Sequence, residues 1–462
     1  MSHDRNKTLA KDVVIYSIGN IGNKFLMFLL FPVLLFFMER EELGSYDIPL
    51  EVVLFLLPVV TLQMRESTFR LLVDNQDETY RRNILSGTLG IESIMFTIVL
   101  LIAVLLSFFV SIRYFHLIIL SIYAYSIYEI YSQAVRSIYS STQFARLNII
   151  NSLLIIVLVL LFYFVFKRGV EGLFWGNILA RMLSISIIEI PRRQVVRNLS
   201  FRFIKKTHIK EILSYCIPML AAAIAYGLIT SSGKFIVNYL YGDEQSGILA
   251  AAQKYMYILL VLGLSFYQAW QVTAVKNYQE QGSKQFFTVV FNKYIVVLCL
   301  LVLCISFGLR SFKSFLIGPE FHQSIHYIFV YCVSSMFLCL AWFFETIYQC
   351  TKQTKKILYS IVSCAVFAPL MTFVLTKYFG VMGNLIMLTL SYAYLFIFRY
   401  FQTRSTLPVR LQKDFFLSLT GLITGGLFFY FISNPVIDIL IFLIASLLLA
   451  CFLFVSRKYF IK

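Results

Sequence analysis

The sequence predicts an all-α polytopic membrane protein built from a duplicated bundle of helices. Of its 462 residues, 59% are hydrophobic and only 14% are charged, which excludes a water-soluble domain. Apolar stretches of about 18 residues or more recur from end to end and predict membrane helices. The motif Tyr139-Ser-Ser-Thr142 is echoed roughly 210 residues later by Tyr348-Gln-Cys-Thr351, and such fixed-distance similarity indicates duplication.

About fourteen stretches are long enough to cross a bilayer, which takes about 20 apolar residues for each span. They lie at residues 12–38, 46–64, 84–110, 114–135, 144–166, 169–190, 211–240, 247–272, 287–309, 325–347, 356–376, 379–401, 414–433 and 435–455. The first stretch is too long for a signal-peptide core, and Glu39-Arg40-Glu41-Glu42 follows it instead of a small-residue cleavage site. We therefore interpret it as a retained first span.

Positive charges predict the orientation of these spans, because Lys and Arg accumulate in short cytoplasmic loops. Of the 40 Lys and Arg residues, 29 fall on the side that holds both termini and every second loop, seven on the other side, and four within spans. We therefore expect both termini in the cytoplasm. The net charge of +17 follows mostly from this topology, and the basic run at 192–210 is interpreted as a loop near anionic lipid, not a nucleic-acid site.

Two basic connectors, at residues 191–210 and 402–413, divide the spans into six, six and two. The predicted parts are an N-terminal lobe at 1–208, a C-terminal lobe at 209–403 and two additional helices at 404–462. Gly169 and Gly380 open the sixth span of each lobe, so the lobes are expected to have the same orientation, as a parallel repeat. Glycine at such turns permits positive φ and close helix packing, which predicts a structural role.

The sequence offers no sign of enzyme chemistry, a cofactor or a metal centre. It contains no phosphate-binding loop, nucleophile elbow, zinc-protease or dinucleotide-binding fingerprint. All eight cysteines fall in or at the ends of spans of the second half without a C-x-x-C pair, and we interpret them as small core residues. His322 and His326, next to Glu320, have metal-like spacing but no convincing third ligand.

Ionisable residues at membrane depth are the candidate functional residues, because each costs energy unless it faces a wet cavity or a partner. Lys24 lies midway along the first span, after Asn20 and Asn23 at neighbouring helical positions. Lys234 lies in the seventh span, the leading helix of the second lobe. A cation on the leading helix of each lobe suits a shared cavity that admits an anionic headgroup. We predict that these residues bind substrate.

Four further ionisable residues have more than one interpretation. Lys254, in the eighth span, and Arg181, in the sixth, either add to the same positive lining or extend to the membrane interface. Glu129, in the fourth span, and Glu345, in the tenth, are the deepest acids in the sequence pattern. They either partner cations, relay protons in ion coupling, or lie near helix ends.

Four prolines inside spans are candidate hinges, because proline frees backbone groups that must find other partners. They are Pro32, Pro58, Pro218 and Pro369. Two of them, Pro32 and Pro218, lie on the leading helices of the two lobes, which favours bending around a central site. A static kink kept for packing is the alternative.

Short motifs along the chain resemble the Wzx-type polysaccharide flippases of the MOP superfamily. They are Glu42-Leu-Gly-Ser-Tyr-Asp47, Thr61-Leu-Gln63, Phe69-Arg70, and the Gly-Val-x-Gly sequences at 169–172 and 380–383. The resemblance covers nearly the whole chain in architecture and implies a V-shaped transporter like those of the MATE branch. It also implies a bacterial plasma-membrane protein that moves a polyprenyl-diphosphate-linked oligosaccharide to the outer leaflet for O-antigen, capsule or exopolysaccharide assembly.

Further expectations come with this resemblance. Family members alternate between inward- and outward-open states around a cationic cavity, and Lys24, Lys234 and Lys254 are the matching positions. By analogy with lipid II flippases, the last two spans, with glycines at 421, 425 and 426, form a groove for the lipid tail. Expected partners are the lipid-linked oligosaccharide, membrane lipid, a polysaccharide polymerase and a chain-length regulator.

Three other classes of protein remain as alternatives. A lipid II flippase shares the fourteen-span plan and the cationic cavity. A MATE-type cation-coupled drug antiporter is expected to place a carboxylate deep in the first lobe. In this sequence the middle of the first span has Lys24, and the one acid of that span, Asp12, lies at the cytoplasmic entrance. This pattern disfavours an antiporter. A membrane-bound polymerase or acyltransferase is expected to have a larger outer loop than the short ones found here.

Overall fold

The computed structural model describes residues 26, 30–74, 77–197, 199, 206–353 and 355–460, and these form helices joined by short connections. They cluster into two compact units. Unit 1 comprises Met1–Leu30 and Ser45–Gly227, and unit 2 comprises Phe31–Gly44 and Leu228–Lys462. The boundary between the two units in the sequence lies after Gly227, inside a helix. The division into lobes predicted at residues 208 and 403 stays a prediction.

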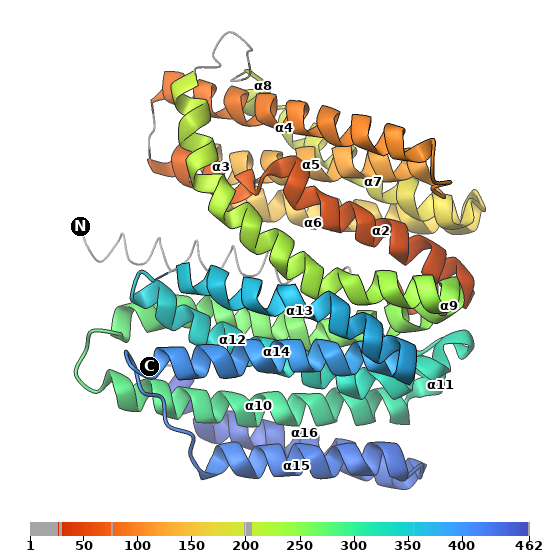
Figure 1. Ribbon diagram of the computed structural model, residues 1–462, viewed down its shortest axis with the longest axis vertical. Helices are drawn as coiled ribbons and strands as arrows, with labels where there is room; N and C mark the ends of the chain where they lie inside the picture. Colours follow the sequence, from red (N-terminus) through yellow and green to blue (C-terminus); the bar gives the residue numbers. More distant parts are fainter. Residues whose placement is uncertain are drawn as a thin grey trace. The chain divides into compact units, whose positions relative to one another are not determined.

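Unit 1 is a bundle of long helices (Figure 1). Its elements are α2 (Arg40–Thr61), α3 (Met64–Asp74), α4 (Glu78–Ser107), α5 (Phe115–Ile138), α6 (Ser141–Leu160), the π-helical turn η1 (Leu161–Val165), α7 (Gly169–Glu189), α8 (Gln194–Arg197) and the first part of α9 (Lys206–Asn277). Side-chain caps start two of them, because Asp77 accepts from the backbone N–H of Tyr80 and Ser140 from that of Gln143.

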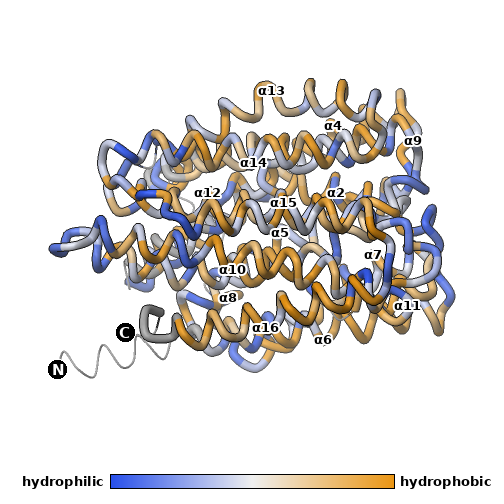
Figure 2. The backbone as a smooth tube through the Cα atoms, turned by 90° about the horizontal axis from the view of Figure 1, so that it is seen from below, coloured by the Kyte–Doolittle hydropathy of each residue, from blue (hydrophilic) through white to orange (hydrophobic). Residues whose placement is uncertain are grey.

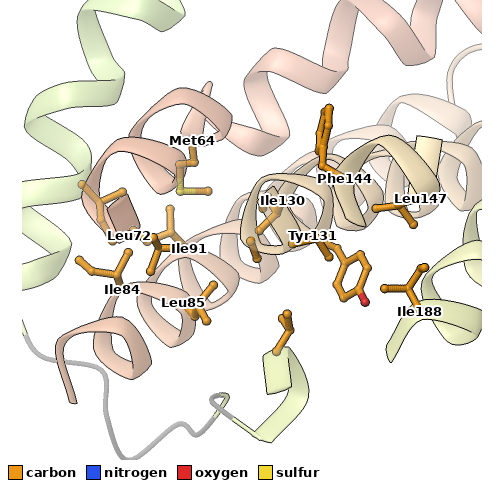
Figure 3. Packing of buried hydrophobic residues seen from close by; sticks show 14 of the residues in the cluster. Met64, Leu72, Ile84, Leu85, Ile91, Ile130, Tyr131, Phe144, Leu147 and Ile188 are labelled. Atoms are coloured by element: carbon orange, nitrogen blue, oxygen red, sulfur yellow. The ribbon is translucent and has the colours of Figure 1, made fainter. Parts of the chain in front are cut away.

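Apolar side chains from α3, α4, α5, α6, α7 and the start of α9 form the core of unit 1 (Figure 3). Met64, Ile84 and Ile212 are fully buried there. A second cluster joins α2 to α4 and α5 through residues that include Val53 and Val99. These two apolar clusters hold α4, α5 and α7 in place and so position the polar side chains of these helices that are described below.

Unit 2 contains the second part of α9 and eight further elements. They are α10 (Ser283–Ser311), α11 (Lys313–Leu316), the 3₁₀ turn η3 (Pro319–Ser324), α12 (Ile325–Cys350), α13 (Lys355–Phe379), α14 (Val381–Thr403), α15 (Lys413–Phe431) and α16 (Pro435–Phe460). Helix α14 packs against α12 and α13, while α10 packs against α15 and α16. Stacked rings such as Trp270 and Phe343, 4.7 Å between centroids, fill this core.

A buried ion pair fixes the last two helices to the rest of unit 2. Arg310, near the end of α10, pairs with Asp438 in the first turn of α16 and also donates to the carbonyl oxygens of Phe429 and Ile432. These carbonyls belong to the end of α15 and the turn after it, so one guanidinium holds both ends of the α15–α16 connection.

Gly242 interrupts α9, where the sequence predicts a gap between the seventh and eighth spans. Its φ of 76° and ψ of −173° lie outside the helical region, in a conformation that is essentially restricted to glycine. The predicted gap between residues 240 and 247 is therefore confirmed, although the helical hydrogen-bond pattern continues to either side.

Each predicted span from the second to the fourteenth coincides with a helix or with one part of α9. Ten helices of the described chain are long and apolar enough to cross a membrane, and Figure 2 shows that hydrophobic residues dominate the helices. Helices α5 and α7 are not among the ten, because their polar side chains lower the mean hydropathy. The protein is a multi-pass membrane protein, and the count of fourteen spans stays a prediction.

The repeated glycines have the structural role that the sequence predicts. Gly169 and Gly380 both have positive φ, 50° and 63°. Gly172 and Gly383 lie against the backbone of the preceding helical segment, and a Cβ on Gly383 would collide with the carbonyl of Leu375. The glycines therefore let each sixth helix pack closely on the fifth.

Candidate functional site

Arg181, predicted as a substrate-binding cation, is a buried side chain of α7 in unit 1 with 9% of its surface exposed. Its guanidinium lies over the ring of Tyr125 on α5, 3.4 Å from the centroid. It donates to the backbone oxygen of Asn177 at 2.8 Å and to the side-chain oxygen of Asn177 at 3.0 Å. These contacts turn the side chain inward, so Arg181 does not extend to an interface as the alternative interpretation had it.

Polar and aromatic side chains surround this arginine. Asn177 donates to the hydroxyl of Tyr46 on α2 at 3.3 Å and accepts from the hydroxyl of Tyr125 at 3.4 Å. One turn along α5 from Tyr125, Tyr128 donates to Asn148 of α6 at 3.0 Å. We call Tyr46, Tyr125, Asn177 and Arg181 the arginine cluster. Its members other than the arginine are neutral, and the next residue of α2 after Tyr46 is a buried acid, Asp47, with 2% of its surface exposed.

Glu129, a predicted acid, lies on α5 with 30% of its side chain exposed and is 3.9 Å from Arg65 of α3. It therefore partners a cation, one of the roles that the sequence left open. A second acid, Glu92 of α4, is more deeply buried, with 3% of its surface exposed. The sequence reasoning did not single out Glu92, although a lone carboxylate inside the apolar stretch at 84–110 was a signal of the same kind.

The predicted lysines Lys234 and Lys254 both lie on α9 in unit 2, and 5% and 7% of their surfaces are exposed. The ammonium of Lys254 lies over the ring of Phe31, 4.5 Å from its centroid. Next to Lys234, Gly233 lets α9 approach α14 so closely that a Cβ there would collide with the side-chain amide of Asn384. Both cations are thus inside unit 2, among close-packed helices.

Glu345 of α12, the other predicted acid, forms a buried salt bridge in unit 2. Arg399 of α14 donates to its carboxylate at 2.7 Å, and the hydroxyl of Tyr267 donates to it at 3.0 Å. Arg399 also donates to the backbone oxygen of Ala341 and to the hydroxyl of Ser360 on α13, both at 3.1 Å. We call Glu345, Arg399, Tyr267 and Ser360 the salt-bridge cluster; it joins four helices.

The sequence analysis did not identify Arg399 as a candidate functional residue. It lies near the end of the predicted twelfth span and was grouped with the basic residues of the following loop. Its residue surface is 2% exposed and it lies within α14, so it is a buried helical side chain and not a loop residue. The sequence does show an acid, Glu345, and a base, Arg399, on different predicted spans. It does not show that these two residues, 54 positions apart, lie close together in space.

The predicted hinge prolines lie within helical segments. Pro58 lies in α2, Pro369 in α13 and Pro218 in α9, while Pro32 lies in the helical segment at 30–35. Their role in motion stays a prediction. A break that the sequence did not predict separates α2 from α3, where Leu62 and Gln63 have φ of 47° and 55°.

Three predicted substrate-binding residues, Lys24, Asn20 and Asn23, lie outside the described residues. Elsewhere in the described chain, no three His, Cys, Asp or Glu side chains are placed to hold a metal ion. The ring of His322 instead contacts the backbone oxygen of Ile317 at 3.1 Å. All eight cysteines are free thiols.

The sequence matches one protein family over more than half of its length. Residues 9–270 fit the model of the family described as "Polysaccharide biosynthesis protein". No curated protein has significant sequence similarity to the chain.

Solved structures with the same fold are membrane transporters. The lipid II flippase MurJ, in an inward closed conformation, superposes with a TM-score of 0.72 at 17% identity, over 96% of this chain and 99% of that one. An inward-facing multidrug resistance MATE transporter of the MOP superfamily gives 0.64 at 12% identity, over 87% and 95%. An outward-facing MATE transporter of that superfamily gives 0.60 at 14% identity, over 90% and 96%.

Proposed function

Because the chain belongs to the polysaccharide biosynthesis protein family and has the fold of MOP-superfamily transporters, we propose that it flips a polyprenyl-diphosphate-linked oligosaccharide. The lipid-linked repeat unit moves from the cytoplasmic to the outer leaflet of the bacterial plasma membrane, for O-antigen, capsule or exopolysaccharide assembly. Family and fold support a flippase and not an enzyme.

The observation that supports this substrate is a buried arginine whose hydrogen bonds and ring contact are made with uncharged groups. A diphosphate is an anion that cannot cross hydrocarbon unaided, whereas its prenyl tail remains in lipid. Arg181 makes contacts with an amide, a carbonyl and an aromatic ring, so its charge stays available to an anion. In this proposal Arg181, Lys234, Lys254 and Lys24 bind the diphosphate, and Asn20 and Asn23 contact the headgroup.

The proposed cycle is alternating access, with both termini in the cytoplasm. The distribution of Lys and Arg along the sequence supports this orientation. Prolines in helices, such as Pro58 and Pro369, are proposed to bend during the exchange. A polysaccharide polymerase and a chain-length regulator are the proposed downstream partners, since a flipped repeat unit must be polymerised.

Lipid II is the second candidate substrate. The TM-score of 0.72 with a lipid II flippase favours it, and lipid II also carries a diphosphate on a prenyl tail. The two substrates differ in the headgroup beyond the diphosphate, so a direct comparison of both lipids separates them. A cation-coupled drug antiporter is less well supported, because buried cations repel cationic drugs.

The proposal is tested with purified protein in liposomes that contain a labelled prenyl-diphosphate oligosaccharide in the inner leaflet. Flipping is measured as the label that becomes accessible to an impermeant glycosidase. We expect Lys234→Ala and Lys254→Ala to slow flipping at least about tenfold, a loss of about 1.4 kcal/mol of binding energy for each tenfold. The matched control is Lys276→Ala, an exposed lysine of the same helix.

Equal rates for all three lysine variants would contradict the assignment of these cations. If the wild type flips lipid II in a parallel sample but does not flip the oligosaccharide lipid, lipid II is the substrate. Uptake of a cationic dye without flipping of either lipid would overturn the flippase proposal.

A further inference from the structure

A row of hydrogen-bonded side chains joins α9 to α12 in unit 2. It starts at Glu345 of α12, whose carboxylate accepts from Arg399 at 2.7 Å and from the hydroxyl of Tyr267 at 3.0 Å. Gln349, one turn after Glu345, donates to the same hydroxyl at 3.0 Å. Gln271, one turn after Tyr267 on α9, donates to the side-chain oxygen of Gln349 at 3.0 Å. We call Tyr267, Gln349 and Gln271 the amide row.

The carboxylate of Glu345 fixes the direction of every bond in the amide row. A carboxylate paired with a guanidinium is ionised and only accepts hydrogen bonds, so Tyr267 gives its one proton to Glu345. The oxygen of Tyr267 then accepts from the amide nitrogen of Gln349, and the amide oxygen of Gln349 accepts from Gln271. The side chain of Gln271 therefore keeps its own amide oxygen and one N–H for a further partner.

Gln271 is the outer end of the row. It is partly exposed, whereas Arg399 beyond the other end is 2% exposed. Within the part of the chain that the structure describes, the side chain of Gln271 makes no hydrogen bond besides the one with Gln349. It lies within two turns of the end of α9 at Asn277, and Gln349 is next to the last residue of α12. The free amide thus lies near the ends of both helices.

An aromatic ring lies beside the row. Trp342 of α12 is partly exposed, and its ring centroid is 5.7 Å from that of Tyr267. Trp342 lies seven residues before Gln349 and therefore on the same helical face, about 10 Å away along the helix axis. A ring and a free amide at this separation suit two linked sugars, because a sugar has an apolar face of C–H groups and hydroxyls that both donate and accept.

The amide row carries no net charge. The salt bridge of 2.7 Å between Arg399 and Glu345 neutralises both groups, and amides, a phenol and an indole are neutral. A neutral ligand rich in hydroxyl groups therefore suits this region of unit 2 better than a diphosphate does. Pockets that combine aromatic rings with a few polar groups are typical of small-ligand sites.

We propose that Trp342 and Gln271 form a site for neutral sugars of the oligosaccharide headgroup. One sugar packs its C–H face against the indole ring. The neighbouring sugar donates a hydroxyl to the amide oxygen of Gln271 and accepts from its N–H through an adjacent hydroxyl. Tyr267 and Gln349 are positioning residues, since they orient Gln271. The ligand of this site rests on the proposed function, but its residues are separate from the cations proposed to bind the diphosphate.

The test is titration calorimetry of the purified full-length protein with matched ligands. One ligand is a short-chain prenyl diphosphate without sugar. The others are the same diphosphate carrying an oligosaccharide of glucose, of galactose or of N-acetylglucosamine. The ratio of the two affinities, with and without sugar, isolates the sugar contribution from that of the diphosphate. We expect the wild type to bind at least one glycolipid more tightly than the bare diphosphate.

Gln271→Ala is expected to lower this ratio about fivefold, the size expected for one lost neutral hydrogen bond, and to leave the affinity for the bare diphosphate unchanged. Trp342→Ala is expected to lower the ratio as well, and Trp342→Phe, which keeps a ring, to retain more of it. The matched control is Gln285→Ala, an exposed glutamine of α10, which is expected to keep the wild-type ratio.

Two results overturn the sugar site and leave the proposed function standing. The first is a ratio unchanged in both Gln271→Ala and Trp342→Ala, even if their unfolding midpoints fall, since the row then only holds α9 against α12. The second is a wild type that binds the bare diphosphate as tightly as all the glycolipids. If the wild type binds neither the bare diphosphate nor any glycolipid, the proposed function fails and the sugar site fails with it.

Discussion

Arg181 of unit 1 and Arg399 of unit 2 are both buried and held by neighbouring helices, and the two differ in what surrounds the charge. Arg181 of unit 1 contacts neutral groups, the ring of Tyr125 and the amide of Asn177. Arg399 of unit 2 donates to the carboxylate of Glu345 at 2.7 Å. A paired charge is largely cancelled at a distance, whereas an unneutralised one attracts an anion. We therefore propose that the first arginine binds substrate and that the second holds helices together.

Breaking the salt-bridge cluster is expected to have the largest effect on stability. Arg399→Met leaves the carboxylate of Glu345 buried without its cation, which is expected to destabilise the protein by about 3–5 kcal/mol. The measurement is the unfolding midpoint in detergent. Replacing both residues, as Arg399→Met with Glu345→Met, is expected to recover most of the loss, since no buried charge then remains.

If the double variant were as unstable as the single one, Arg399 would have a role beyond neutralising Glu345. The same substitution in unit 1, Arg181→Met, is the matched comparison. It leaves no carboxylate behind and is expected to cost clearly less stability than Arg399→Met. Equal losses at the two arginines would break the distinction between them.

The repeated glycines of the two units differ in how closely the neighbouring backbone approaches them. Gly383→Ala places a methyl group against the carbonyl of Leu375, whereas Gly172→Ala meets the backbone of Phe162 at 3.0 Å. We expect Gly383→Ala to cost about 1–3 kcal/mol and Gly172→Ala to cost less. Thermal unfolding measures both. The control Gly421→Ala has open space around it and is expected to be neutral or slightly stabilising.

Anion binding is the next effect in size. Arg181→Gln is expected to weaken binding of a short-chain prenyl diphosphate about tenfold, equivalent to about 1.4 kcal/mol, because the ligand loses a cation. Titration calorimetry with the purified protein checks this. Arg181→Lys keeps the charge but loses the planar group that stacks on Tyr125, so an intermediate affinity is expected. Unchanged affinity in Arg181→Gln would remove Arg181 from the site.

The last comparison concerns the two repeat tyrosines. Tyr139 donates to the carboxylate of Glu189 at 3.1 Å, while Tyr348 donates to the neutral amide oxygen of Gln402. Hydrogen bonds to charged groups contribute about 1.5–3 kcal/mol and neutral ones about 0.5–1.5. Tyr139→Phe is therefore expected to lower stability more than Tyr348→Phe, measured by chemical denaturation. A larger loss of stability in Tyr348→Phe than in Tyr139→Phe would contradict this assignment of the two hydrogen bonds.

Hydropathy predicted the positions of most helices, because a membrane helix must bury a long apolar stretch whatever its neighbours are. The same argument identified Arg181, a charge in the middle of such a stretch. Arg399 lies two residues from the end of the predicted span 379–401, where the sequence does not reveal whether the side chain turns toward water or toward Glu345. The turn at Leu62 and Gln63 was also unpredicted, since nothing local requires positive φ at these residues.

The most direct test of the account is the flipping rate of the prenyl-diphosphate oligosaccharide in liposomes for Arg181→Gln and for the double variant Arg399→Met with Glu345→Met. The account predicts a loss of at least about tenfold for the first, because the anion loses its cation. It predicts a rate close to that of the wild type for the second, whose charges cancel in the native protein. Normal flipping by Arg181→Gln, together with loss of flipping in the folded double variant, would contradict it.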